Sequence, residues 1–449
     1  MTNSDANSPI DYRPPGDTQG LHGGKQLIAF NWLLFLYPAS LAVNKTLHDV
    51  VSVSLLLLSL ICLVRCRAIL AERLQPVRKL WILALVLPIC LAAAQYFLLD
   101  PPLPLRGFDD VSRYLPGIPI YLALLVTRPN FRYFLRGCLV FVLYSVALLL
   151  VHMQILGLDR GAPPNGFLAI IPQTSLTIVL AALSTWLWLD ADGTWRKRIP
   201  PILLCLLGLA APLLSVTRSG LLIAASLGIV AWLLLARRNL LVPLCGAAVA
   251  VITAVVVMSS STLWPRQDNT VTEINQYLTR PETALTSATI RIELWRAAGK
   301  MFLSHPVLGI GNHRFPGELG TLVARKETRT SMELFTHPHN EFLRAAAEGG
   351  IVGILSLALL YGVPMAAGIA AYSSPARRIG AGVLIVLTSG FILAGLVDIL
   401  LYWRETILFF SITMSLMLVA LDTGWRTDNR VVIASTTDSD ARESARKKT

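Results

Sequence analysis

Long apolar stretches recur along almost the whole chain, separated by short polar breaks that carry most of the charged side chains. Most stretches hold roughly 17 to 25 residues, the length that an α-helix needs to cross about 30 Å of hydrocarbon at 1.5 Å per residue. The pattern predicts twelve transmembrane helices, at residues 27–44, 48–64, 80–98, 114–127, 133–156, 166–189, 199–216, 218–236, 240–262, 342–372, 379–400 and 405–421. The fourth is short, and residues 215–219 divide the seventh from the eighth.

Residues 263–341 interrupt this rhythm with a polar segment that is too long to be a simple connector. Apolar side chains recur within it at helical spacing, with charged ones on the other faces, which predicts an amphipathic helix at about 288–303. His305 and Pro306 end this helix. A Gly-Ile-Gly sequence at 309–311 follows, either as a plain turn or as a backbone nest for an oxyanion, and a polar arm is expected from 318 to 336.

The composition supports a membrane protein. Of 449 residues, 54% are hydrophobic and only 15% are charged, and the mean hydropathy is +0.60. One soluble core could not bury so much apolar side chain. We predict an all-α integral membrane protein with a cytoplasmic N-terminal tail (1–26), helices one to nine (27–262), an outer loop (263–341), helices ten to twelve (342–421) and a cytoplasmic C-terminal tail (422–449).

The distribution of Lys and Arg orients the chain, because cationic loops stay on the cytoplasmic side. With the N-terminus inside, the short inner loops hold fifteen Lys or Arg and the short outer loops hold six, which places both termini in the cytoplasm. The outer loop departs from this rule with nine of its own, and Arg344 just past its end makes ten. An anionic partner is therefore expected at the outer face, with phosphates or pyrophosphates as the obvious candidates. The net charge of +12 requires no nucleic acid, since the inner loops and the basic tail suit an anionic membrane leaflet.

Several functional classes lose support from what the sequence lacks. It contains no phosphate-binding Gly-X-X-X-X-Gly-Lys-Ser/Thr loop, no Gly-X-Ser-X-Gly elbow and no His-Glu-X-X-His pair. The six cysteines all lie in or beside apolar stretches, so a disulfide framework is not expected. ATP-driven transport and ordinary hydrolase chemistry are thus unsupported.

Two histidines, His337 and His339, stand where the outer loop meets the tenth apolar stretch. Imidazole changes charge near neutral pH, so a base placed here would lie close to a lipid-borne substrate and still reach water. The two side chains point the same way in an extended segment, which superficially suits a metal. We disfavour a metal, because no third His, Cys or Asp stands at ligand spacing and Pro338 fixes the backbone between them. His305 and His313 lack a spaced carboxylate and are interpreted as loop histidines.

Three charged residues, two near the outer ends of spans and one on the amphipathic loop helix, each have two interpretations. Arg218 either snorkels to the interface from a helix end or presents a fixed cation to a lipid phosphate. Arg291 belongs either to a solvated helix face or to the same cationic site. Asp398 forms a structural ion pair or supports the site, with Arg404 or one of the two arginines as its partner.

The sequence His339-Asn340, followed after nine residues by Gly-Ile-Val-Gly at 350–353, resembles the histidine motif of the lipopolysaccharide O-antigen ligases, the WaaL family. The resemblance extends to the twelve spans, the inner termini and the large late loop. It also includes Arg218 in a Thr-Arg-Ser-Gly context and Arg291 on the loop helix before Trp295.

This resemblance implies a membrane glycosyltransferase of the GT-C type with a large, mostly helical periplasmic loop. Such an enzyme moves a finished polysaccharide from undecaprenyl pyrophosphate to a sugar of lipid A-core. It works at the periplasmic face of the bacterial inner membrane, inverts the anomeric carbon, and needs no metal, ATP or other cofactor. Because the carrier pyrophosphate is already an activated leaving group, the protein has only to align the reactants, take one proton and stabilise the departing charge.

The resemblance also implies roles for individual residues. His339 would be the general base that deprotonates the acceptor hydroxyl, with His337 as the fallback base. Arg218 and Arg291 would hold the pyrophosphate through guanidinium forks, and Arg266 joins them by its position at the start of the loop. Asn340 caps the helix that begins near Glu341 or fixes the histidine tautomer, and capping is favoured.

Two rival functions remain open on the sequence. An O-antigen or capsule polymerase uses the same donor with a lipid-linked glycan as acceptor, and none of these residues excludes it. A transporter or lipid flippase would also have many spans, but it predicts charged or helix-breaking positions near the bilayer midplane in two corresponding halves. The ionisable residues of this chain gather at the outer ends of the spans instead, which favours chemistry at the membrane surface.

Overall fold

The computed structural model describes residues 25–65, 76–156, 168–189, 199–215, 217–235, 279, 286–329, 332 and 334–423. These residues form helices and connections, without a strand among them. A helix lies over every expected span except the ninth, residues 240–262, which falls outside the described residues. The two predicted tails also lie almost entirely outside them.

The helices that lie over expected spans differ in length. Among the described helices, seven are long and apolar enough to cross a membrane: α1 (Lys25–Val43), α2 (Lys45–Arg65), α4 (Pro76–Leu98), α7 (Arg132–Leu149, continued by a π-helical turn to Ile155), α15 (Glu341–Tyr372), α16 (Arg378–Val397) and α17 (Arg404–Thr423). Shorter apolar stretches lie in α8 (Ile170–Leu189), α9 (Ile199–Leu214) and α10 (Arg218–Leu235). The chain is therefore a multi-pass helical membrane protein. Twelve spans and the GT-C architecture stay predictions.

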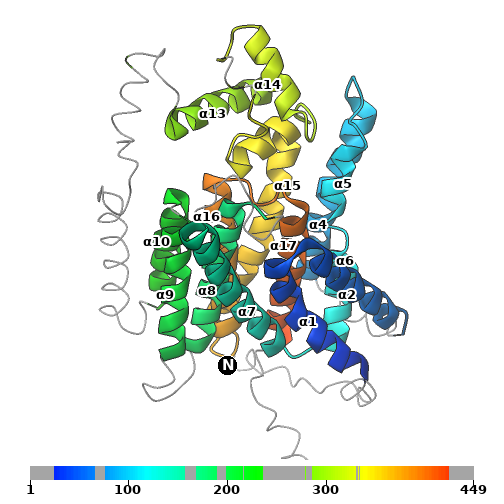
Figure 1. Cartoon of the computed structure of the whole chain (residues 1–449). Helices are drawn as coiled ribbons and strands as arrows, with labels where there is room; N and C mark the ends of the chain where they lie inside the picture. The colour runs from blue at the N-terminus through cyan, green and yellow to red at the C-terminus, as the bar shows by residue number, and fades with distance from the viewer. Residues whose placement is uncertain are drawn as a thin grey trace, which may run out of the picture.

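The centre of the bundle is formed by α16 and α17, whose side chains are buried along most of their length. The other long helices surround them in Figure 1, where α15 runs beside α16 and the pair of α8 and α10 packs on its other side. Phe391, Phe409 and Phe410 fill the interior, and Trp81 of α4 donates a hydrogen bond to Ser415 Oγ at 2.9 Å. The packing of this core fixes the positions of the helices whose ends carry the candidate site.

A helical cap lies at the end of the molecule where α15 begins, at the top of Figure 1. Its first helix, α13 (Ser287–Ser304), is the amphipathic helix expected at about 288–303, and it buries Leu294 and Met301. These side chains pack with Phe315 and Leu319 of a second helix, α14 (Phe315–Ala324). The expected polar arm from 318 to 336 is thus wrong in its first part, because apolar residues at helical spacing fold that stretch onto α13.

The connection between the cap and the bundle depends on glycine. Gly350 interrupts α15 with φ 61° and ψ −151°, and a Cβ at this position would meet the Val307 carbonyl oxygen at 2.4 Å. The break lets the 306–311 segment pair with α15: Ile310 N donates to Ala347 O at 2.9 Å, and Ile351 N donates to Pro306 O at 2.8 Å. The amides of the Gly-Ile-Gly turn are therefore used to dock the loop, and an oxyanion nest there is not supported.

Candidate active site

The histidine segment is held at the N-terminus of α15 by Asn340. Its side-chain oxygen accepts hydrogen bonds from Phe342 N and Leu343 N, both at 3.0 Å, so Asn340 is the N-cap of the helix. Its side-chain nitrogen donates to Leu396 O of α16, also at 3.0 Å. One side chain thus begins α15 and fixes the preceding loop against the end of α16.

His339 and His337 converge on one carboxylate, that of Asp398. The ring nitrogen His339 Nδ1 lies 3.0 Å from Asp398 Oδ1, and His337 Nε2 lies 4.0 Å from the same oxygen. The two imidazole rings are 4.4 Å apart between centroids. Asp398 is the C-cap residue of α16, at the outer end of the helix. The expected pairing of Asp398 with Arg404 is wrong, because Arg404 pairs with other carboxylates.

The two histidines differ in how their surroundings act on them. Burial, with the neighbouring charges of His339 and Arg344, lowers the pKa of His337 to about 4 against the opposing effect of Asp398. His337 is consequently neutral at pH 7. His339 makes the closer contact with the carboxylate, and its φ of +50° is unusual for a residue with a side chain. That geometry orients the ring of His339 with a carboxylate on its Nδ1.

The cap helix α13 reaches this segment through Trp295, whose indole N–H donates to Pro338 O at 3.0 Å. Pro338 lies between the two histidines. Arg291 stands one helical turn before Trp295 and so shares its face of α13. No ion pair engages Arg291 within the described part of the chain. Arg291 is thus half-buried on the helix face whose Trp295 contacts the histidine segment, and its role in a cationic site stays a prediction.

The structure says less about the other two arginines expected at the site, Arg218 and Arg266. Arg218 is the first residue of α10, after the break that ends α9 at Leu214, as the sequence predicted. The N-terminus of α10 follows Thr217, whose hydroxyl lies 3.0 Å from that of Ser215. Arg266 lies outside the described residues. The proposed roles of both arginines stay predictions.

A buried ion cluster that the sequence analysis missed supports the first turns of α15. Arg344 Nη2 lies 2.7 Å from Glu341 Oε1, and Arg344 Nη1 lies 3.1 Å from Glu348 Oε2. Leu401 joins this cluster through both backbone groups, donating from N to Glu341 Oε2 at 2.7 Å and accepting from Arg344 at O. The spacing of three and four residues could have indicated these pairs, since such side chains share a helix face.

A second histidine–carboxylate pair forms on the other side of Tyr402. His313 Nε2 contacts Asp110 of α5 (Arg106–Ser112), so the interpretation of His313 as a loop histidine without a carboxylate is wrong. Arg404 Nε also donates to Asp110 at 3.0 Å, and Arg404 Nη2 lies 2.6 Å from Asp109 Oδ2. Burial alone would raise the pKa of Asp110, but its hydrogen bonds and charge interactions with His313 and Arg404 lower it overall.

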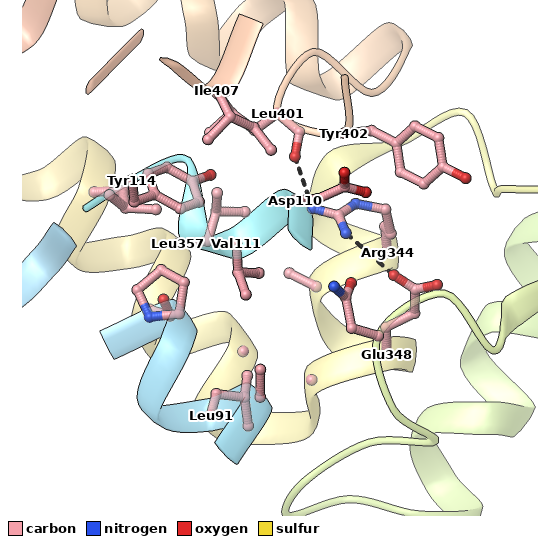
Figure 2. Close-up of a pocket in the computed structure, with 18 of the residues that line it drawn as sticks. Leu91, Asp110, Val111, Tyr114, Arg344, Glu348, Leu357, Leu401, Tyr402 and Ile407 are labelled. Carbon is pink, nitrogen blue, oxygen red and sulfur yellow. Dashed lines mark hydrogen bonds and ion pairs between the residues drawn. The ribbon is translucent and has the colours of Figure 1, made fainter. Parts of the chain in front are cut away.

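The ring of Tyr402 lies between the two histidine groups. Its centroid is 5.5 Å from the ring of His337, 5.3 Å from that of His313 and 5.8 Å from the Arg344 guanidinium carbon. A pocket of about 80 Å³ opens beside it, between α4, α5, α15 and the segment before α17. Figure 2 shows Arg344, Glu348, Asp110 and Tyr402 gathered at one side of this pocket, with Leu91 and Tyr114 away from them. The structure therefore brings a titratable pair and a partly polar pocket to the same aromatic ring.

The histidine group also bears on the question of a metal. One ligand atom from each of His337, His339 and Asp398 lies within 4.8 Å of the others, close enough to share one ion. The argument that no third ligand is near the histidines is therefore wrong, because Asp398 arrives from a distant part of the chain. Two of these groups, His339 and Asp398, equally form a hydrogen-bonded pair, with His339 Nδ1 3.0 Å from the carboxylate oxygen.

Comparison with known proteins identifies a family. Residues 203–358 match the family model described as O-antigen ligase, which confirms the resemblance that the histidine motif indicated. This stretch includes Arg218, Arg291, His337 and His339. The family comprises glycosyltransferase-like enzymes and covers both ligases and polymerases. A comparison with curated proteins found no match.

Proposed function

From its match to the O-antigen ligase family, we propose that the protein is an O-antigen ligase. It transfers a polysaccharide en bloc from undecaprenyl pyrophosphate to a sugar hydroxyl of lipid A-core, in the periplasmic leaflet of the bacterial inner membrane. The lipid-linked polysaccharide donor and the lipid A-core acceptor are the general substrate classes of the family. Both termini lie in the cytoplasm in this proposal, and the outer loop of residues 263–341 lies in the periplasm.

The observation that carries the proposal is the contact between His339 Nδ1 and Asp398 Oδ1 at 3.0 Å. With its proton on Nδ1 and donated to the carboxylate, the imidazole has a lone pair on Nε2 for a substrate hydroxyl. Asp398 then stabilises the imidazolium that forms when the proton is taken, as a carboxylate does for the histidine of a catalytic triad. His337 packs against the ring of His339. Because His337 is neutral at pH 7, it adds no positive charge near Asp398.

The reaction needs one proton transfer and one displacement. The acceptor oxygen attacks the anomeric carbon from the face opposite the pyrophosphate, which inverts that carbon. The bond from the carbon to the pyrophosphate oxygen breaks, and the pyrophosphate leaves with the electron pair. The hydroxyl proton passes to Nε2 of His339. Arg291 and Arg218, with Arg266, neutralise the leaving group through guanidinium forks in place of a metal ion.

The product that accumulates in a deletion strain tests the ligase against its rivals. A ligase defect leaves long polysaccharide chains on the carrier lipid and bare lipid A-core on a gel. A polymerase defect leaves single repeat units on the carrier instead. A flippase defect holds the carrier-linked sugars on the cytoplasmic side of the membrane, so either of these last two outcomes would overturn the proposal.

A chelator tests the metal-free step. Purified protein treated with EDTA and assayed with purified donor and acceptor is expected to keep its transfer rate, because the proton goes to imidazole and the charge to guanidinium. A rate that falls on chelation and returns with added Zn²⁺ or Mn²⁺ would instead make His337, His339 and Asp398 a metal centre.

A further inference from the structure

We infer that the pocket beside Tyr402 is a subsite for one neutral sugar ring of the acceptor, with Tyr402, Asp110 and His313 as its contact residues. The inference rests on the proposed transferase function and adds to it the place and chemistry of acceptor recognition. It depends on three properties of the pocket: its position next to the base, the sign of its charge, and the kinds of surface that line it.

The position follows from Tyr402, which contacts both histidine groups. Its ring lies 5.5 Å from the ring of His337 on one side and 5.3 Å from the ring of His313 on the other. His339, the proposed base, lies 4.4 Å beyond His337 between ring centroids. A saccharide seated against Tyr402 on the pocket side would thus present its next ring to the base. Neighbouring sugars of one oligosaccharide span such a distance.

The charge of the residues around the pocket indicates that its ligand is a neutral sugar and not a phosphate. Asp110 and Glu348 line its polar side with the guanidinium of Arg344, and Arg404 pairs with Asp110 from outside the lining. Both arginines already pair with these carboxylates, Arg404 with Asp110 at 3.0 Å and Arg344 with Glu348 at 3.1 Å. Two carboxylates against one guanidinium in the lining disfavour a pyrophosphate and favour hydroxyl donors. The leaving group therefore belongs at Arg291 on the cap, and the pocket belongs to the other substrate.

The lining has the two kinds of surface that a sugar ring presents. Its polar side offers carboxylate oxygens, and a carboxylate accepts about four hydrogen bonds, so Asp110 keeps capacity beyond His313 and Arg404. Its apolar side consists of Leu91, Leu357 and Leu360 with the ring of Tyr114, which suits the C–H face of a pyranose. The volume of about 80 Å³ is well below the 300–1,000 Å³ of a site for a larger ligand. It admits one ring or part of one.

The test is a transfer assay with purified protein, in which the acceptor and the donor are titrated separately. Tyr402→Leu removes the aromatic ring, and we expect it to raise the acceptor KM about tenfold, the equivalent of 1.4 kcal/mol, while the donor KM stays the same. Tyr402→Phe keeps the ring and is expected to stay within about threefold of wild type, since about 0.7 kcal/mol covers that change. Tyr96→Leu is the matched control, because Tyr96 makes edge-to-face contacts with Phe97 and Phe108 and does not line the pocket.

A binding measurement removes catalysis from the readout. His339→Ala protein is mixed with delipidated core oligosaccharide, with Tyr402 either kept or changed to Leu, and bound sugar is measured by equilibrium dialysis. Weaker binding with Tyr402→Leu supports the subsite. Equal binding overturns it, as would a donor KM that rises in place of the acceptor KM. If wild-type protein extends carrier-linked glycan instead of decorating lipid A-core, the ligase proposal fails. The Tyr402 variants then test the subsite on that acceptor.

Discussion

Two histidine–carboxylate pairs flank Tyr402, and they differ in the charge that reaches each carboxylate. Asp398 and Asp110 are equally buried, with 12% of each side chain exposed. Among the described residues, the side-chain partners of Asp398 are the imidazoles of His337 and His339. Asp110 contacts His313 and also accepts a hydrogen bond from the guanidinium of Arg404 at 3.0 Å.

This difference indicates which of the two histidines is the stronger base. A carboxylate that faces only imidazoles keeps its charge for the imidazolium that proton abstraction creates, which strengthens the base. A carboxylate already neutralised by a guanidinium offers less to its histidine. We therefore assign chemistry to His339 with Asp398 and ligand contact to His313 with Asp110. Burial alone would not separate them.

The largest expected effect is the contrast between His339→Ala and His313→Ala. Loss of the general base is expected to lower kcat by about 10² to 10⁴, the usual contribution of such a group. Loss of His313 is expected to act mainly on the acceptor KM. Initial rates of polysaccharide transfer over a range of acceptor concentrations measure both. Equal losses of kcat in the two variants would remove the distinction between the pairs.

Substitutions of the two carboxylates test the same difference between the histidine pairs while leaving both imidazole rings in place. Asp398→Asn keeps the shape but cannot stabilise an imidazolium and favours the wrong tautomer of His339, so kcat is expected to fall on the order of 10². Asp110→Asn leaves His339 and its carboxylate untouched, and its kcat is expected to stay within about threefold of wild type, the equivalent of 0.7 kcal/mol. The same transfer assay decides, and a larger kcat loss for Asp110→Asn would reverse the assignment.

Arg291 supplies a third contrast, because it shares the face of α13 whose Trp295 contacts the segment that holds His339. Arg291→Lys keeps the charge but loses the bidentate fork, and it is expected to lower kcat/KM for the donor about tenfold. Arg325→Lys is the control, since Arg325 is an exposed arginine of the same cap. A wild-type kcat/KM in Arg291→Lys would exclude this guanidinium from the proposed pyrophosphate site.

The smallest expected effect concerns pH and stability. His337 has a folded pKa of about 4 against an ordinary value of 6.5, so the unfolded chain binds more protons between these values. Stability is then complete above pH 6.5 and is lost as the pH falls toward 4. His337→Asn is expected to reduce the fall in Tm between pH 7 and pH 5 by about 2 °C. His305→Asn, at an exposed histidine, is the control and should match wild type.

Local signals in the sequence predicted most of the helices of this protein. Apolar stretches long enough to span hydrocarbon marked the helices, and alternating faces marked α13. Asn340 before Glu341 indicated the start of α15, because an N-cap acts within three residues. The missed helix α14 had a similar signal in Phe315, Leu319, Leu322 and Val323, which its polar neighbours obscured.

The sequence by itself determined which segments leave water and which histidines and arginines precede the apolar helices, because hydropathy, capping and positive charge act over a few neighbouring residues. Only the tertiary structure decided which carboxylate each histidine received. Asp398 is 59 residues from His339 in the sequence. Asp110 belongs to α5 and contacts His313, which lies in the turn before α14. A hydrogen bond or ion pair depends on distance in space, and the packing of α5, α15, α16 and α17 sets that distance.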